Sequence, residues 1–264
     1  MTQTTRAGTP PAAAAGSVSI GTDLTVHRLG FGAMRLTGRG VWGEPADRAG
    51  AVRVLRRALE LGVNFIDTAD SYGPGVSEEI IAEALFPYPP GLVIATKGGL
   101  TRPGADRWER DAHPAHLRAA CEGSLKRLRL ARIDLYQLHA IDPGVPLEDS
   151  LGELMRLRAE GKIRHIGVSN VSAAELAHAQ RLVSVVSVQN RYNQTDRSSE
   201  DVLKLCERAG IAFIPWFPLG AGRDAANAKG AIAWLLARSP VMLPIPGTSS
   251  VAHLEENVAA AALH

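Results

Sequence analysis

Apolar residues along the chain fall into short continuous runs that alternate with longer amphipathic stretches. The runs predict strands buried on both faces, and the stretches, in which apolar residues recur every three or four positions, predict helices. After a first pair of strands at 18–21 and 24–30, the predicted strands are residues 31–36, 64–68, 92–96, 133–138, 163–168, 185–188, 211–216 and 241–245. The predicted helices are residues 47–61, 77–85, 113–128, 147–159, 173–182, 200–209, 230–238 and 251–262, and residues 98–111 are predicted as a loop.

Strands that each precede a helix indicate a parallel sheet covered by helices, either an open doubly wound sheet or a closed barrel. The open dinucleotide-binding form carries Gly-x-Gly-x-x-Gly after its first strand. Neither Gly30-Phe31-Gly32 nor Gly220-Ala221-Gly222 completes that pattern. We therefore predict an α/β fold, a (β/α)8 TIM barrel with an N-terminal β-hairpin, whose active site lies at the carboxyl ends of the strands.

The composition argues against several classes of protein. The 264 residues suit one large domain, which we place at 17–264, after a flexible tail of Thr, Pro, Ala and Gly at 1–16. The 29 basic and 27 acidic residues are interspersed, so no basic stripe suggests nucleic acid, and no apolar run suggests a membrane. Two cysteines, Cys121 and Cys206, argue against a disulfide scaffold or a structural zinc. We expect a cytoplasmic monomer.

Ionisable residues stand where successive predicted strands end. Asp67, Lys97 and His139 follow three of these strands, and Tyr72 comes five residues after Asp67. Each of them alone could be a turn former, a solvated lysine or a structural histidine. Together around one pocket they suit proton transfer to a carbonyl oxygen, because an adjacent ammonium lowers the pKa of a phenol from its usual ~10. No cluster has metal-ligand spacing and no nucleophile is paired with a base, so a nicotinamide is the natural source of electrons.

Seven motifs follow one another along the chain: Leu29–Met34, Gly62–Gly73, Ala95–Lys97, Ile133–His139, Gly161–Asn170, Val188–Asn190 and Ile245–Thr248. As an ordered set they resemble the aldo-keto reductases over about residues 29–259. The resemblance implies the barrel fold, an NADPH cofactor and a catalytic tetrad of Asp67, Tyr72, Lys97 and His139, with Tyr72 as general acid.

The resemblance also implies cofactor contacts. Ser169, Asn170 and Gln189 would hold the nicotinamide carboxamide, and Trp216 would stack on the ring, with simple core filling as the alternative for Trp216. The remaining implied contacts are Pro218, Leu219 and Gly220 at the pyrophosphate and Thr248, His253, Glu256 and Asn257 at the adenosine end.

Two departures from the family pattern bear on the cofactor. Gly247 and His253 stand where many members carry lysine or arginine around the ribose 2′-phosphate, so NADH stays open beside NADPH. Thr248, Ser249, Ser250 and the N-terminus of the last helix could hold a phosphate instead. The connection at 220–229 is short for the family, either a true deletion or a missing stretch, and a true deletion predicts weaker cofactor binding.

The substrate is expected to be a small or medium aldehyde or ketone. Trp42 and Trp108, in rim loops, could build an apolar pocket for it, including for pyridoxal-like compounds. Two alternatives stay open: a barrel lyase with Lys97 as Schiff-base amine, and a reductase-like cofactor-sensing subunit with little turnover.

Overall fold

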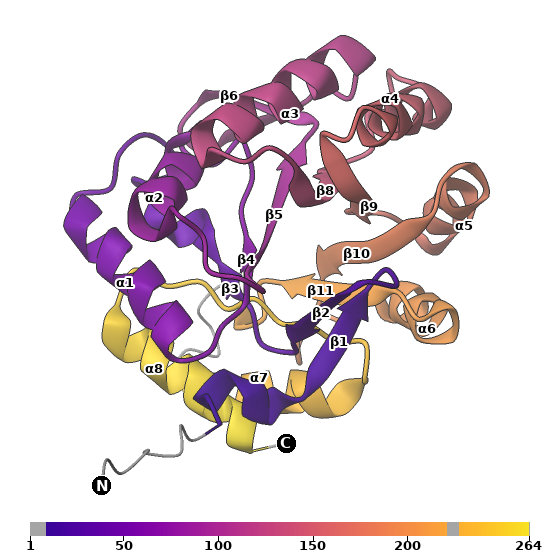
Figure 1. Cartoon of the computed structure of the whole chain (residues 1–264). Coiled ribbons are helices and arrows are strands. Elements are labelled where there is room, and N and C mark those ends of the chain that lie inside the picture. Colours follow the sequence, from indigo (N-terminus) through magenta and orange to yellow (C-terminus); the bar gives the residue numbers. More distant parts are fainter. Residues whose placement is uncertain (1–8, 221–226, 264) are drawn as a thin grey trace, which may run out of the picture.

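Seven parallel strands form one curved sheet, and their order in the sheet is their order along the chain (Figure 1). The computed structural model describes residues 9–220 and 227–263. When a parallel sheet curls into a barrel, its helical crossovers all lie on the outer face, which is the arrangement seen. The strands are β3 (Phe31–Gly32), β4 (Phe65–Asp67), β5 (Val93–Gly98), β8 (Ile133–Leu138), β9 (Ile163–Ser169), β10 (Val185–Arg191) and β11 (Ala212–Trp216).

Helices surround the sheet (Figure 1) and present their apolar faces to it. Their positions agree closely with the predicted stretches, because the apolar repeat of each one fixes which residues must be buried. They are α1 (Arg48–Glu60), α2 (Val76–Leu85), α3 (Pro114–Leu128), α4 (Leu147–Ala159), α5 (Ala173–Leu182), α6 (Glu200–Ala209), α7 (Ala228–Arg238) and α8 (Val251–Ala259). No helix of the described segments is both long and apolar enough to cross a membrane.

The segment 241–245 closes the sheet into a barrel. The Leu243 N–H donates to Phe213 O on β11 at 2.8 Å, and the Gly30 N–H, just before β3, donates to Pro244 O at 3.0 Å. The segment pairs with β11 through a single bridge, so it is extended but not the regular strand that the sequence predicted. With this segment in the eighth strand position, the fold is the predicted (β/α)8 barrel.

Two glycines permit the close approach at this seam. A Cβ on Gly32 would lie 2.7 Å from Ile245 O, and a Cβ on Gly247 would lie 2.4 Å from Gly32 O. Both distances are shorter than real side chains tolerate, so only glycine fits at either position.

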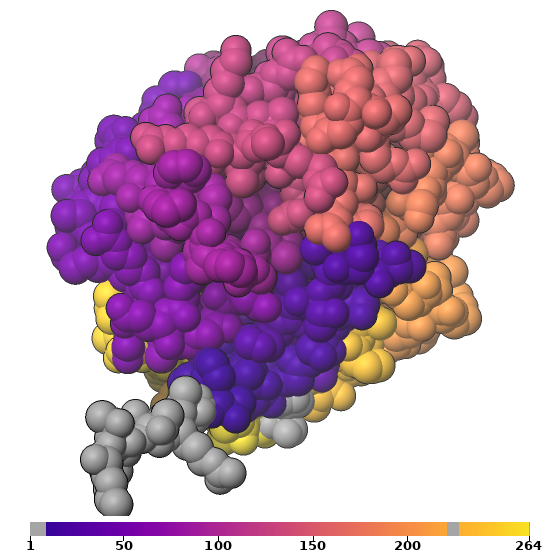
Figure 2. Space-filling model, viewed as in Figure 1, coloured from indigo at the N-terminus to yellow at the C-terminus, as the bar shows by residue number. Residues whose placement is uncertain are grey.

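The N-terminal hairpin covers one end of the barrel. β1 (Ser17–Ile20) and β2 (Leu24–His27) pair antiparallel, as predicted, and their indigo surface crosses the middle and lower part of the face in Figure 2. The buried side chains of Val18, Ile20 and Val26 pack against Phe65 and Val93, close to where β4 and β5 begin. The hairpin therefore plugs the amino-terminal end, which leaves the opposite rim for chemistry.

Residues 11–15 differ from the expected flexible tail. Pro11–Ala15 form a short 3-10 helix, η1, whose Ala12 and Ala15 are fully buried. Ala12 donates its backbone N–H to Leu61 O at 2.9 Å. A composition of alanine and proline is typical of linkers, but small side chains such as Ala12 and Ala15 also permit close packing against neighbouring helices. Residues 1–8 lie outside the described part of the chain.

Three local predictions were wrong. The predicted loop 98–111 contains a second hairpin, formed by β6 (Leu100–Gly104) and β7 (Arg107–Arg110). The predicted strand 31–36 ends at Gly32 and continues as a 3-10 turn, η2 (Ala33–Leu36). The predicted helix 77–85 does not begin at Ser77: α2 begins at Val76 after its N-cap Gly75, with φ +82°, and the Ser77 hydroxyl bonds Thr68 Oγ1 and Ala33 O inside the fold.

Candidate active site

Four ionisable side chains converge at the carboxyl-terminal rim of the barrel. Asp67 ends β4, Lys97 lies near the end of β5, His139 follows β8, and Tyr72 lies in the loop between β4 and α2. All four are buried: Lys97 is 0% exposed, Asp67 2%, Tyr72 6% and His139 7%. The structure therefore brings together the predicted tetrad, and we use that name for these four residues.

Lys97 is the centre of the tetrad. Its Nζ donates to Asp67 Oδ2 and to Thr68 O, both at 2.7 Å, and reaches Tyr72 Oη at 3.5 Å. Burial works to lower the pKa of Lys97, but the nearby Asp67 and Tyr72 outweigh it, so the net pKa is raised. The lysine is consequently an ammonium ion at neutral pH.

The second oxygen of Asp67 accepts hydrogen bonds from two glutamines on other strands of the sheet. Gln189 Nε2 on β10 donates to Asp67 Oδ1 at 2.7 Å, and Gln137 Nε2 on β8 donates to it at 3.3 Å. A buried carboxylate is tolerated only when its lone pairs are occupied in this way. The two amides fix the carboxylate, and through it Lys97.

The Tyr72 hydroxyl is a weaker acid here than the sequence suggested. Burial raises the pKa of Tyr72, and the lowering effect of Lys97 does not overcome it. The expected net lowering of this pKa is thus not what the structure gives. Tyr72 therefore holds its proton throughout the neutral range.

His139 is neutral at physiological pH. Burial first, and then the charges of Lys97 and Arg102, hold its pKa well below the usual 6.5. Its Nδ1 lies 3.4 Å from Ser71 Oγ, and its ring meets that of Tyr72 edge-on with centroids 5.9 Å apart. One ring nitrogen of His139 is thereby engaged by the Tyr72 loop.

Two tryptophans flank the tetrad on the side of the β6–β7 hairpin. The Trp108 ring lies 6.3 Å from the ring centroids of both Tyr72 and His139 and is 39% exposed. Trp42 is 37% exposed, and the guanidinium carbon of Arg102 lies 5.9 Å from its ring centroid. Both tryptophans are at the rim, as expected for a pocket wall.

Hydrogen bonds join the residues predicted for the carboxamide to the tetrad. Asn170 Nδ2 donates to His139 O at 2.9 Å and to Ser169 Oγ at 3.0 Å, and Ser169 Oγ donates to Gln189 O at 2.8 Å. The Trp216 Nε1–H donates to Asn170 Oδ1 at 3.0 Å. Trp216 is only partly buried, which disfavours a purely core-filling role.

The remaining predicted contacts lie further along the rim. Pro218 and Leu219 follow β11, and Gly220, with φ +55°, closes a turn through its N–H to Phe217 O. Buried Thr248 precedes α8, whereas His253, Glu256 and Asn257 lie on that helix, with only Asn257 buried. Of the short connection at 220–229, residues 221–226 lie outside the described part of the chain.

Sequence reasoning missed Gln137, Ser71 and Arg102. Gln137 precedes His139 by two residues, so strand alternation puts both on one face, and that signal was available. Ser71 was read only as part of a motif. Arg102 stands beside a proline in a charged stretch, which usually indicates solvent rather than burial.

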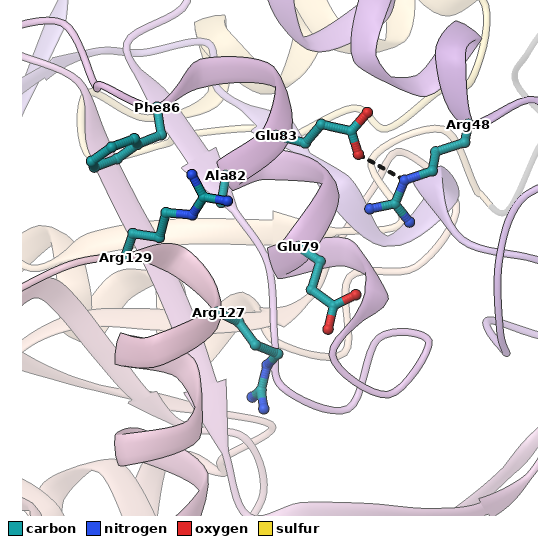
Figure 3. A pocket seen from close by; sticks show the side chains of 7 residues that line it. All are labelled: Arg48, Glu79, Ala82, Glu83, Phe86, Arg127 and Arg129. Atoms are coloured by element: carbon teal, nitrogen blue, oxygen red, sulfur yellow. Dashed lines mark hydrogen bonds and ion pairs between the residues drawn. The ribbon is translucent and has the colours of Figure 1, made fainter.

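A separate hollow of about 380 Å³ lies outside the barrel, away from the tetrad (Figure 3). Two of its arginines are matched by carboxylates, Arg48 by Glu83 and Arg127 by Glu78, while Arg129 lies over the Phe86 ring. The hollow is therefore a surface ion-pair region. Within the described segments no group of three or more His, Cys, Asp or Glu side chains is placed to hold a metal.

Comparison with known proteins identifies the family. Residues 28–229 match the model of the aldo/keto reductase family. This chain belongs to that family. It is 48% identical to an uncharacterized oxidoreductase of Schizosaccharomyces pombe, over 100% of this chain and 90% of that protein. It is 44% identical to pyridoxine 4-dehydrogenase of Escherichia coli, over 91% of each.

A solved structure of an aldo-keto reductase from Klebsiella pneumoniae in complex with NADPH also matches. It superposes with a TM-score of 0.78 at 30% identity, covering 93% of this chain and 89% of that one. Family membership makes the protein an oxidoreductase and agrees with the barrel described above.

Proposed function

We propose that this protein transfers hydride from NADPH to an aldehyde or ketone, with Tyr72 as general acid assisted by Lys97, Asp67 and His139. One observation carries the proposal: the buried Lys97 ammonium lies between Asp67 Oδ2 at 2.7 Å and Tyr72 Oη at 3.5 Å. This arrangement stabilises the negative charge that Tyr72 acquires when it gives up its proton.

The rim offers groups that suit NADPH. Ser169, Asn170 and Gln189 supply hydroxyl and amide groups of the kind that match a carboxamide. The hydrogen bond to Asn170 orients the partly exposed Trp216 ring, which offers a flat face for stacking. When bound there, the cofactor supplies the hydride that the protein itself lacks.

Each tetrad residue has a distinct task. Tyr72 Oη donates its proton to the substrate oxygen while Lys97 stabilises the phenolate left behind. Asp67, fixed by Gln137 and Gln189, keeps the ammonium in place. Neutral His139 orients the substrate oxygen: if Ser71 donates to Nδ1, the ring hydrogen is on Nε2 and is available to the carbonyl.

The phosphate end of the cofactor would be held without lysine or arginine at 247 and 253. Ser250 Oγ accepts from the His253 N–H at 3.4 Å, and Thr248 Oγ1 accepts from the Ser250 N–H at 3.0 Å. These contacts order the start of α8, whose remaining N–H groups and dipole favour an anion. We propose NADPH as cofactor, with NADH as the comparison in the test.

An aromatic aldehyde is the substrate class that suits this rim best. Trp108 beside Tyr72 and His139 gives the pocket an aromatic wall. A relative at 44% identity bears the name pyridoxine 4-dehydrogenase, so pyridoxal belongs among the aldehydes tested here.

The first test is Tyr72→Phe, with oxidation of NADPH by 4-nitrobenzaldehyde followed at the nicotinamide absorbance band. Loss of the proton donor should lower kcat by about 10²- to 10⁴-fold with cofactor affinity nearly unchanged. Tyr88→Phe is the matched control, since the Tyr88 hydroxyl donates to Leu128 O away from the rim. Full activity of Tyr72→Phe would contradict the acid role.

Assays of the wild-type protein distinguish the reductase from the cofactor sensor and the Schiff-base lyase. A panel including pyridoxal and 4-nitrobenzaldehyde is run with NADPH and NADH in parallel. NADPH binding without oxidation across the panel would indicate a sensor. Borohydride trapping of substrate on Lys97 without a nicotinamide requirement would indicate the Schiff-base lyase.

A further inference from the structure

We propose that Arg102 is a positioning residue for carbonyl reduction, which holds Trp108 and the Tyr72 loop in place over the reacting atoms. The proposal rests on the proposed function, and it assigns to the β6–β7 hairpin the task of shaping the substrate side of the tetrad.

Arg102 joins three separate segments through its guanidinium group. Nη1 donates to Val41 O at 2.9 Å and to Ser71 O at 3.3 Å, which links the 38–43 loop to the Tyr72 loop. Nη2 donates to Gly40 O at 2.7 Å and to Gly104 O at 3.4 Å, and Nε donates to Arg107 O at 2.8 Å. Removing the side chain takes all of these hydrogen bonds away at a place that water hardly reaches, because Arg102 is itself only 7% exposed.

The guanidinium plane also supports Trp108. The guanidinium carbon lies 3.6 Å from the ring centroid of Trp108, a distance typical of direct stacking. One face of the indole is thus fixed against a side chain that backbone hydrogen bonds already hold. Stacking of this kind limits the rotation of Trp108 although the residue is 39% exposed.

Trp108 transmits this constraint to the tetrad. Its ring meets Tyr72 at an interplanar angle of 85° and His139 at 71°, so three rings form the walls of one corner. Ser71, whose carbonyl binds Arg102, also places its hydroxyl 3.4 Å from His139 Nδ1. Arg102 is therefore linked to His139 and Tyr72 in two ways, through the Trp108 ring and through the backbone of the Tyr72 loop at Ser71.

Only arginine suits this position. The planar fork offers five donor hydrogens in fixed directions and a flat face for stacking, whereas lysine offers three donors on a compact ammonium. Arg102→Lys keeps the charge and part of the hydrogen bonding but loses the stacking surface. A graded series from arginine through lysine to methionine should therefore separate charge from geometry.

The test is a double-mutant cycle of Arg102→Met and Trp108→Ala, read as kcat and KM with NADPH and 4-nitrobenzaldehyde. Arg102→Met should lower kcat/KM by about 10- to 100-fold, as expected when reacting groups are misplaced by ~1 Å. Arg102→Lys should recover part of this loss. The kcat/KM of the double variant should be little lower than that of either single variant, because both substitutions disrupt the same Arg102–Trp108 contact. Cofactor affinity should stay unchanged.

A second arginine provides the matched control. Arg28 also donates to backbone carbonyls, of Leu236, Ser239 and Met242, but it follows the N-terminal hairpin at the other end of the barrel. Arg28→Met should leave the kinetics intact and should combine additively with Trp108→Ala. Additivity in the Arg102 cycle, or an equal loss in Arg28→Met, would overturn the positioning role.

Tryptophan fluorescence tests whether Arg102 holds Trp108 independently of any catalytic activity. The emission difference between wild type and Arg102→Met should disappear in a Trp108→Ala background, since it reports the stacked indole. If the wild-type protein reduces no carbonyl, the proposed function fails, and this optical cycle alone decides whether Arg102 holds Trp108. An unchanged emission difference would then overturn the inference.

Discussion

Asp70 is a carboxyl group in the Tyr72 loop that the proposed reaction does not use. Its Oδ1 is buried and accepts no hydrogen bond from any described residue. Burial, and after it the Glu78 carboxylate, raises the pKa of Asp70 from 3.8 to about 8. The group is consequently protonated in the folded protein at neutral pH.

This protonation makes stability depend on pH. Between pH 3.8 and about 8 the folded state keeps a proton that the unfolded state has lost, so stability falls as the pH rises through this window. Asp70→Asn removes the titration and should raise the melting temperature at pH 8.5 more than at pH 5. The measurement is a thermal melt at both values, with exposed Asp149→Asn as control. An equal effect of Asp70→Asn at both pH values would exclude a titrating Asp70.

The tetrad residues were predictable from the sequence, whereas Gln137 and Arg102, which contact them or their loops, were not, for a physical reason. Asp67, Lys97 and His139 end strands, and ionisable groups are rare beside a barrel core, so their position alone is informative. Gln137 and Arg102 act by binding a carboxylate or carbonyls that are distant in the chain. An amide in a strand or an arginine in a polar loop has the same local pattern whether or not such a partner exists.

At the scale of elements, the seam between β3 and 241–247 depends on Gly32 and Gly247. A Cβ on Gly247 would lie 2.4 Å from Gly32 O, so Gly247→Ala must push the two segments apart. We expect a loss of about 1–3 kcal/mol in the free energy of unfolding, the usual cost of overpacking, measured by urea denaturation.

Gly152→Ala in α4 is the matched control. A Cβ there meets no atom within 4 Å, and helix propensity should make this variant more stable by about 0.5–1 kcal/mol. Equal stability of Gly247→Ala and wild type would show that the seam can open at no cost.

Helices were predictable to within a few residues, whereas the β6–β7 hairpin was not. The apolar repeat of α6, for example, defines a face that only a helix can bury. Residues 100–110 contain Pro103 and several charged residues, and β7 is exposed at every position, so no alternating pattern marked a strand. The segment 241–245 was predictable as extended, but Pro244 within it and Pro246 directly after it prevent a regular ladder.

At the scale of the whole molecule, η1 ties the start of the described chain to its end. η1 packs against α8 and the final 3-10 turn, η5 (Ala260–Ala262), and buries Ala15 completely. Ala15→Asp places a carboxylate in that contact and should cost about 3 kcal/mol, lowering the melting temperature by about 6–12 °C.

Exposed Ala14→Asp in the same turn is the control and should change stability by no more than about 0.5 kcal/mol. Kinetic constants of both variants should match wild type at temperatures where they are folded, because η1 is far from the rim. Similar melting of the two variants would restore the view of residues 11–15 as a loose tail.

The carboxylate of Asp67 has a consequence for how activity arises during folding. Its partners come from β5, β8 and β10, so a segment that ends before β10 can form the Asp67–Lys97 pair but lacks Gln189. Joining residues 67 and 189 closes a loop of more than a hundred residues, which costs more conformational entropy than a local contact does. The hydrogen bonds around Asp67, and with them the fixed ammonium beside Tyr72, are therefore complete only when the strands from β4 to β10 have assembled.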